Sequence, residues 1–401
     1  MKYLQEYLDT YGDISFRDKP FNEVDNLIFS QLIYNDFGTI VEQDKRVFLS
    51  DAAAEFAAQH PEEKIDTLLD VAKRAARLLA LVGKKRRYSG TVICNYINNI
   101  SDAIDKQICA ASFITSDGAM MVAFRGTDAT VAGFKESAML AYMFPVPAQI
   151  EALHYFQESA MLHRGKVRLC GHSKGGNLAI FAAVNCSNSL KKKIDTVYAF
   201  DAPGFPEWFF ERYDYQQIRD SLHIVNPSNS IVGRALAMEK EPELVISTAK
   251  RGRQHNVATW VIEDDGFARA EAYTEESDKL GAYVNDLVAY IGDEDLEVFY
   301  DALEQTANQL GISDFYDLKE VDTNLVFIII DSIQTLNPEQ KKRFRALVMK
   351  VASDAAKDYM SGAATWAKGK VKTISQKLPF VGKNKEEKAE STDTVQTETD
   401  G

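Results

Sequence analysis

The chain has 401 residues, of which 45% are hydrophobic and 10% aromatic, and its formal net charge is -13. This length suits either one large α/β domain with an appendage or two domains, and the apolar content is sufficient for a buried core. The negative charge argues against nucleic acid as a partner of the whole protein, because phosphate binding needs a basic surface.

The N-terminal residues lack the regions of a signal peptide, and the apolar run at 325–330 is far shorter than a membrane span. The four cysteines show no Cys-x-x-Cys spacing and lie within apolar segments, at positions 94, 109, 170 and 186. We expect reduced core thiols in a cytoplasmic protein, and neither a metal site nor a cofactor is indicated.

Residues 1–88 are expected to be mainly helical, with helical apolar spacing over 21–34, 50–59 and 62–81. After Gly90 the pattern changes to strands, and the Asp117-Gly118 pair between β-like runs at 108–115 and 120–124 predicts a hairpin. A helix over 149–162 precedes further strands, which are expected at 166–170, 196–200, 222–225, 244–247 and 258–262. Strands alternating with helices at this spacing predict an α/β fold, a mostly parallel sheet with flanking helices.

Beyond residue 292 the chain is expected to be helical again, with candidate helices at 296–310, 325–335 and 338–360. The last candidate is basic and amphipathic. We expect this helix to pack on its own domain, and weak contact with a membrane surface through 338–375 is the alternative. The polar tail is expected to be disordered. The predicted organisation is a main domain over 1–292 that includes the helical region 1–88, a helical region over 293–378, and the tail over 379–401.

The most informative motif is Gly-x-Ser-x-Gly at 171–175, which follows a β-like run and precedes an apolar helical pattern. This context favours a nucleophile elbow over a chance match, with Ser173 as nucleophile. Gly171 and Gly175 stand where only small residues let the neighbouring chain pass. The serine is then placed at a helix N-terminus, where backbone N–H groups and the helix dipole favour a developing anion.

A serine nucleophile needs a base, which in this fold follows it in the chain. Of the six histidines, four precede Ser173 or adjoin it: His60, His154, His163 and His172. His223 lies within a strand pattern, which is typical of a core histidine. His255 lies in a polar loop between two predicted strands and is the predicted base.

The acid that orients the histidine is predicted to be Asp201, directly after the strand at 196–200. Its alternative role is that of a turn or capping residue, because Asp-x-Pro-Gly is ordinary loop sequence. The stretch 226–233, after the next strand, contains no carboxylate.

Two donors are predicted for the oxyanion of an acyl-transfer intermediate. One is the backbone N–H of Lys174. The other is Thr127, in the Arg-Gly-Thr-Asp turn at 125–128 that follows a predicted strand. Arg125 in the same turn is equally well explained as a structural residue.

These motifs resemble class 3 lipases and, more closely, the bacterial Mbeg-like lipase-related family. The matching segments are found at 21–25, 124–127, 145–149, 171–179, 200–205 and 254–255 with Trp260, so the resemblance covers roughly residues 1–292. The resemblance implies an α/β-hydrolase fold in which Ser173 is the nucleophile, His255 the base, and Thr127 and Lys174 the oxyanion hole.

The sequence departs from the class 3 pattern at three places. Ser230 stands where class 3 lipases carry the acid, Lys174 replaces the apolar residue common after the nucleophile, and 134–137 lacks the usual Trp-x-x-Asp. Either Asp201 substitutes for the missing acid or the triad is weakened.

The predicted function is that of a serine acyl hydrolase, lipase- or esterase-like, acting on a small-molecule ester or lipid. The alternatives are a thioesterase with the same triad and a hydrolase-fold binding or scaffold protein with weakened catalysis. The helical N-terminal region and residues 129–147 are interpreted either as a lid over the site or as part of the core and crossover.

Overall fold

The structure is a computed structural model that describes residues 1–42, 45–68, 70–101, 106–127, 139–249 and 253–279, together with positions 133, 136–137, 281–282, 285, 338–339 and 342. The chain divides into two compact units, Met1–Phe344 and Arg345–Gly401, and every described residue belongs to the first. The boundary expected after 292, the helices expected at 296–310 and 325–335 and the tail lie outside the described residues. So does the region 338–375, apart from positions 338, 339 and 342.

The described helices are α1 Lys2–Tyr11, α2 Glu23–Leu32, α3 Leu49–Gln59, α4 Glu62–Ile65, α5 Asp70–Val82, α6 Arg86–Ser89, α8 Pro147–Met161, α9 Lys174–Asn185, α10 Asn188–Lys191 and α11 Tyr213–Gln216. The strands are β1 Val47–Phe48, β2 Val92–Ser101, β3 Lys106–Ile114, β4 Met120–Phe124, β5 Val167–His172, β6 Ile194–Phe200, β7 Leu222–Pro227, β8 Glu243–Val245, β9 Ile262–Glu263 and β10 Gly266–Phe267. Short 3-10 helices are η2 Glu207–Glu211, η3 Arg219–Ser221, η4 Val232–Arg234, η5 Arg253–His255 and η6 Val257–Thr259.

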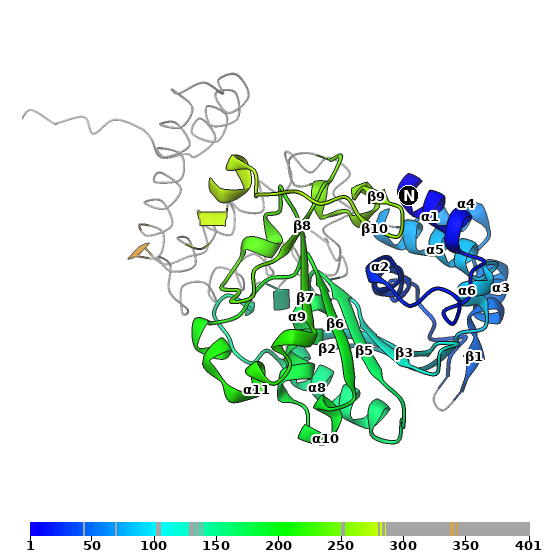
Figure 1. The fold of residues 1–401 in the computed structure, drawn as a ribbon, viewed down its shortest axis with the longest axis horizontal. Helices are drawn as coiled ribbons and strands as arrows, with labels where there is room; N and C mark the ends of the chain where they lie inside the picture. The colour runs from blue at the N-terminus through cyan, green and yellow to red at the C-terminus, as the bar shows by residue number, and fades with distance from the viewer. Residues whose placement is uncertain are drawn as a thin grey trace, which may run out of the picture. The chain divides into compact units, whose positions relative to one another are not determined.

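Strands β1 to β8 form one sheet in sequence order (Figure 1). β4 to β8 run parallel to one another, and β1 to β4 pair antiparallel. The predicted Asp117-Gly118 hairpin joins β3 and β4, and Gly118 has the positive φ of 86° that this turn requires. The predicted α/β architecture with a mostly parallel sheet is thereby confirmed.

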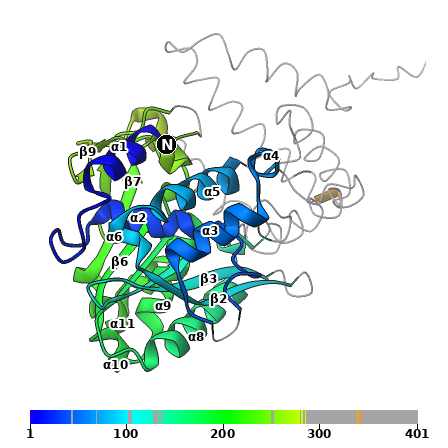
Figure 2. The ribbon, with the colours of Figure 1, turned by 90° about the vertical axis from the view of Figure 1, so that its right-hand side faces the viewer.

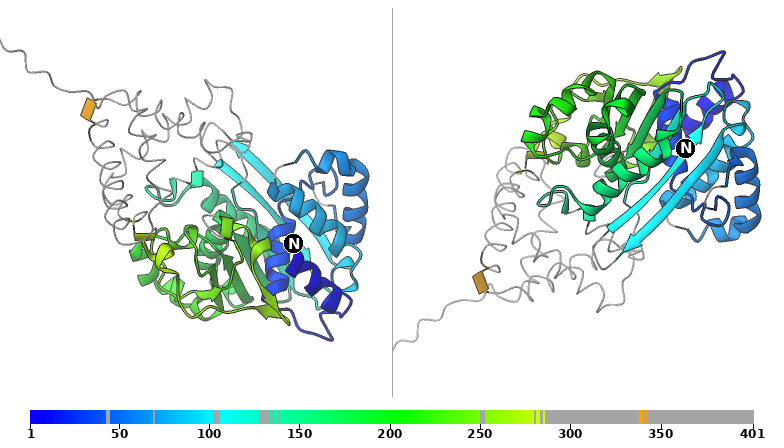
Figure 3. Two further views of the ribbon diagram at one scale, coloured as in Figure 1. Left: turned by 90° about the horizontal axis from the view of Figure 1, so that it is seen from above. Right: turned by 90° about the horizontal axis from the view of Figure 1, so that it is seen from below.

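Helices cover both faces of the sheet, as Figures 2 and 3 show. The N-terminal helices, in blue, lie on one face, and α8 and α9 lie on the other with α10 and α11. Alternate residues of β3 therefore enter different cores: Cys109 packs with the N-terminal helices, whereas Ile108 and Ala110 pack with α8 and α9. Burial on both faces explains why the central strands read as continuous apolar runs.

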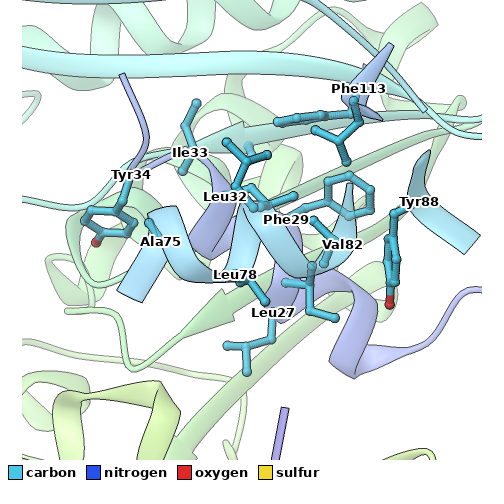
Figure 4. Close-up of a cluster of buried hydrophobic side chains, with 14 of the residues drawn as sticks. Leu27, Phe29, Leu32, Ile33, Tyr34, Ala75, Leu78, Val82, Tyr88 and Phe113 are labelled. Atoms are coloured by element: carbon cyan, nitrogen blue, oxygen red, sulfur yellow. The ribbon is translucent and has the colours of Figure 1, made fainter. Parts of the chain in front are cut away.

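Helix α2 is the element of the N-terminal layer that packs on the central strands. It begins with a capping box between Asn22 and Asp25. The Asp25 carboxylate is fully buried and accepts hydrogen bonds from Arg87 (2.6 Å from Nη2) and the Tyr88 hydroxyl (2.6 Å). The hydrophobic cluster between α2, α5 and β3 (Figure 4) fixes α2 against the sheet.

Two predicted elements differ from the structure. The helix expected over 62–81 is divided into α4 and α5, because a 3-10-type bond from Thr67 N to Lys64 O ends the first piece. The strand expected over 258–262 begins instead within the 3-10 helix η6, which includes Ala258 and Thr259 and is capped by the Asn256 side chain, the acceptor of a hydrogen bond from Ala258 N (3.1 Å). Trp260 makes only an isolated β-bridge with Ser247, and Ile262 is the one residue of that run in β9.

Candidate active site

Ser173 lies on the sharp turn between β5 and α9, with φ 58° and ψ -133°. Such a backbone conformation is strained for a residue with a side chain, and this strain is found mainly at functional sites. A Cβ added at Gly171 would lie 2.1 Å from the carbonyl carbon of Gly175, and one at Gly175 would lie 2.2 Å from the carbonyl oxygen of Phe124. The turn therefore depends on glycine at both positions and has the strand–turn–helix form that a nucleophile elbow requires.

The structure brings His255 and Asp201 together although 54 residues separate them. Nδ1 of His255, the last residue of η5, lies 2.7 Å from Oδ2 of Asp201. Asp201 follows β6 directly, is fully buried and has a positive φ of 45°. A carboxylate at Nδ1 holds the proton there, so Nε2 is left as the proton acceptor, as a general base requires.

The second oxygen of Asp201 is held by two groups that the sequence did not assign. Oδ1 accepts hydrogen bonds from the Ser230 hydroxyl and from the Gly233 backbone N–H at 3.0 Å. Ser230 is fully buried and comes from the loop after β7. Ser230 and Gly233 therefore hold one carboxylate oxygen of Asp201 while His255 contacts the other.

The turn after β4 passes directly beside the elbow. A Cβ added at Gly126 would lie 3.1 Å from the Cβ of Ser173. The Thr127 hydroxyl is hydrogen-bonded to Ser137 Oγ, and Ser137 in turn donates to the Gly133 carbonyl at 2.9 Å. Since the Ser137 proton is used there, the Thr127 hydroxyl donates to Ser137, and its backbone N–H is the group of Thr127 that is a candidate oxyanion donor.

Lys174 is the first residue of α9, where backbone N–H groups point beyond the N-terminus of the helix. Its side chain is buried: Nζ lies 2.6 Å from Glu136 Oε2 and 2.8 Å from both the carbonyl oxygen and Oε1 of Gln107. Glu136 also accepts hydrogen bonds from the backbone N–H groups of Gln107 and Ala148, both at 2.9 Å. The Lys174 ammonium therefore connects the first residue of α9 to Glu136, which follows the Thr127 turn in the chain.

Neither His172 nor Tyr34 was predicted to be a site residue. The ring of His172 lies 4.4 Å from that of His255, centroid to centroid, and its Nε2 is 2.9 Å from the His255 carbonyl oxygen. The Tyr34 hydroxyl is 3.3 Å from His172 Nδ1 across 138 residues of sequence. The position of His172 inside the motif was the one available signal, and Tyr34 had none.

His223 and Arg125, which the sequence left as possible structural residues, have other partners. His223 stacks on Tyr198 with ring centroids 4.4 Å apart, and its Nδ1 lies 3.0 Å from Glu243 Oε1. Arg125 is buried, and its Nη2 donates to Asn98 Oδ1 at 3.0 Å.

Within the described part of the chain, no group of three or more histidine, cysteine, aspartate or glutamate side chains is arranged to hold a metal ion. All four cysteines are buried, and none of them forms a disulfide. None of the described helices is both long enough and apolar enough to cross a membrane.

A mostly parallel sheet between helical layers, with a serine on the turn after a central strand and an aspartate after the next, defines the α/β-hydrolase class of fold. A family model described as Mbeg1-like matches residues 82–305, more than half of the chain. The protein belongs to the Mbeg1-like family, which confirms the resemblance drawn from its motifs.

Among solved structures, the chain is similar to the M37 lipase, with 15% identity, 54% of this chain and 70% of that chain covered, and a TM-score of 0.33. The Lip2 lipase from Yarrowia lipolytica has 11% identity, coverage of 59% and 83%, and a TM-score of 0.33. Lipase II from Rhizopus niveus has 14% identity, coverage of 53% and 76%, and a TM-score of 0.31. A search of the curated proteins found no match.

Proposed function

We propose that the protein is a serine acyl hydrolase that cleaves carboxylic esters with Ser173, His255 and Asp201. The observation that carries the proposal is the 2.7 Å hydrogen bond from His255 Nδ1 to the buried Asp201 carboxylate. Asp201 follows the strand next to β5, which leads to the strained Ser173, and the His255 carbonyl contacts His172, the residue before that serine. The combination matches the parts of an acyl-transfer site.

In the proposed reaction, Ser173 Oγ attacks the ester carbonyl and His255 Nε2 takes its proton. Asp201 stabilises the imidazolium, and the backbone N–H groups of Lys174 and Thr127 receive the oxyanion. The imidazolium then protonates the leaving alcohol. Water, activated by His255, hydrolyses the acyl-enzyme and releases the acid.

The proposed substrate is a small-molecule ester or a lipid, and the reaction needs no cofactor. A thioester would be cleaved by the same groups, so a thioesterase is the nearest alternative. The four buried thiols, none of which forms a disulfide, support a reducing compartment such as the cytoplasm.

A non-hydrolytic binding protein is the alternative from another class. It is favoured by one observation: in the described residues, no hydrogen bond joins Ser173 Oγ to His255 Nε2. Catalytic hydrogen bonds are often long in free enzymes and tighten when substrate binds. The missing hydrogen bond is therefore compatible with hydrolysis.

The test is covalent labelling of the folded protein with a fluorophosphonate probe. Wild-type protein should label and Ser173→Ala should not, whereas Ser187→Ala, which removes an exposed serine, should label at the wild-type rate. A chain-length series of oxygen esters and matched thioesters then defines the substrate class. Failure of folded wild-type protein to label contradicts the hydrolase proposal and favours the binding protein.

A further inference from the structure

Tyr34, His172 and His255 form a hydrogen-bonded chain that runs from the N-terminal helices into the site. Tyr34 follows the C-terminus of α2, His172 ends β5, and His255 ends η5. Their contacts are the 3.3 Å separation of the Tyr34 hydroxyl from His172 Nδ1 and the 2.9 Å separation of His172 Nε2 from the His255 carbonyl oxygen.

The partners of His172 determine which of its nitrogens carries the proton. A carbonyl oxygen is only an acceptor, so Nε2 must be the donor to His255. In a neutral imidazole Nδ1 is then an acceptor, and it receives the Tyr34 hydroxyl proton. Of the two neutral tautomers, only the Nε2–H form satisfies both bonds.

The surroundings of His172 keep its ring neutral. Burial and, next, the positive charge of protonated His255 lower the pKa of His172 well below its ordinary value, although its bond to the His255 carbonyl acts in the opposite direction. Arg74 of α5 lowers it further, Tyr34 faces it from the end of α2, and Asp201 contacts His255 rather than His172. A charge on His172 would oppose the imidazolium that His255 forms during turnover.

Tyr34 also lies against the oxyanion turn. Its hydroxyl is 2.3 Å from the position that a Cβ would occupy at Gly126. Figure 4 shows Tyr34 at the margin of the buried cluster, with its hydroxyl turned away from Phe29 and Phe113. The residue precedes position 82, where the family match begins, so the N-terminal helical layer extends to the site from outside the matched segment.

We propose that His172 and Tyr34 are positioning residues: His172 holds the backbone of His255 in place, and Tyr34 fixes the ring of His172. The expected effect of these residues on catalysis rests on the proposed function. The tautomer and orientation of the two imidazoles are independent of that function and can be measured separately.

The first test compares labelling rates and ester kinetics of three variants. His172→Phe keeps a ring without a donor, and its labelling rate should fall about 10- to 100-fold with little change in KM. His172→Gln retains an amide donor and should recover part of the loss, and Tyr34→Phe should show a smaller fall than His172→Phe. The midpoint of the pH profile should move in His172→Phe and Tyr34→Phe.

The control is Tyr155→Phe, which removes a buried tyrosine hydroxyl bonded to Ser112 at 3.0 Å on the other face of the sheet. It should leave the rate and the pH profile unchanged. A folded His172→Phe variant that labels at the wild-type rate with the wild-type pH profile would overturn the proposal.

The second test reads the imidazoles directly by ¹⁵N NMR of histidine-labelled protein, with signals assigned from His172→Gln and His255→Gln variants. His172 should remain the neutral Nε2–H tautomer over about pH 5.5 to 8, and Tyr34→Phe should shift its Nδ1 signal. Titration of His172 in this range, or an Nδ1–H tautomer, overturns the positioning role. If wild-type protein fails to label, the proposed function alone is lost, and these signals still decide how His172 and Tyr34 are arranged.

Discussion

Ser230 donates a hydrogen bond to Asp201, and the two residues come from the ends of the neighbouring strands β7 and β6. The proposed acid, Asp201, is therefore supported by a residue from the loop that follows the adjacent strand. The carboxylate reaches His255 with one oxygen and is held by Ser230 and Gly233 with the other. This division of roles can be tested at each residue separately.

Replacing Asp201 by Asn should lower the fluorophosphonate labelling rate by about 10⁴-fold, because the amide no longer holds the Nδ1–H tautomer of His255. Ser230→Ala should have a much smaller effect on the rate. It should lower the free energy of unfolding by about 1.5–3 kcal/mol, the range for a hydrogen bond to a charged group. Labelling kinetics and urea unfolding measure the two effects. If Asp201→Asn slowed labelling no more than Ser230→Ala does, the Asp201 carboxylate would not be the group that holds His255 in its reactive tautomer.

The elbow glycines give a prediction about folding. In Gly175→Ala, the new Cβ would meet the Phe124 carbonyl oxygen at 2.2 Å, so the β4 turn and the elbow must move apart. We expect destabilisation of about 1–3 kcal/mol or more. Gly90→Ala is the matched control, because its Cβ meets nothing within 4 Å and its φ is -85°. Thermal unfolding with similar midpoints for both variants would contradict this account of the turn.

The sheet was predictable because its signals are local. Apolar runs buried on both faces mark the central strands, and a hairpin turn at Asp117-Gly118 forces the chain back on itself. The spacing of Gly171, Ser173 and Gly175 likewise reflects one tight turn. Each of these features depends on residues adjacent in sequence, so the pattern alone is informative.

The remainder of the site depends on contacts between distant elements. Tyr34 and Ser230 reach the site by hydrogen bonds from α2 and the β7 loop, and such bonds leave no periodic pattern in the sequence. The side chain of Lys174 could not be placed for the same reason, since its partner Glu136 is 38 residues away. The 3-10 helix η6 was missed because a single capping residue, Asn256, overrides the β-like composition that follows it.

The buried pair of Lys174 and Glu136 gives a prediction about stability. Lys174→Met leaves the Glu136 carboxylate buried without its cation and should lower the free energy of unfolding by about 3–5 kcal/mol. The double variant with Glu136→Gln should lose less than the sum of the single variants, because no charge is then left unpaired. Arg77→Met removes a cation from exposed pairs with Glu62 and Asp66 and should cost about 0–1 kcal/mol for each pair. Additive losses in the double variant would contradict a direct interaction.

The neutral state of His172 makes the stability depend on pH in a defined direction. Above the ordinary histidine pKa of about 6.5, the residue is neutral in both the folded and the unfolded chain and contributes no pH dependence. Below that pH the unfolded chain takes up a proton, whereas the buried imidazole, with its lowered pKa, does not. The free energy of unfolding should therefore fall by up to about 1.4 kcal/mol per pH unit as pH decreases, until the pKa of the folded state is reached.

His172→Gln removes this group, so the difference in unfolding free energy between wild type and variant should shrink as pH falls from about 7.5 to 5. The pKa of His163 is also lowered by burial, but His163 is present in both proteins and its contribution cancels in the difference. Urea unfolding at several pH values measures both curves. Parallel curves would mean that His172 takes up its proton in the folded protein as readily as in the unfolded chain, which would contradict the lowering of its pKa by burial.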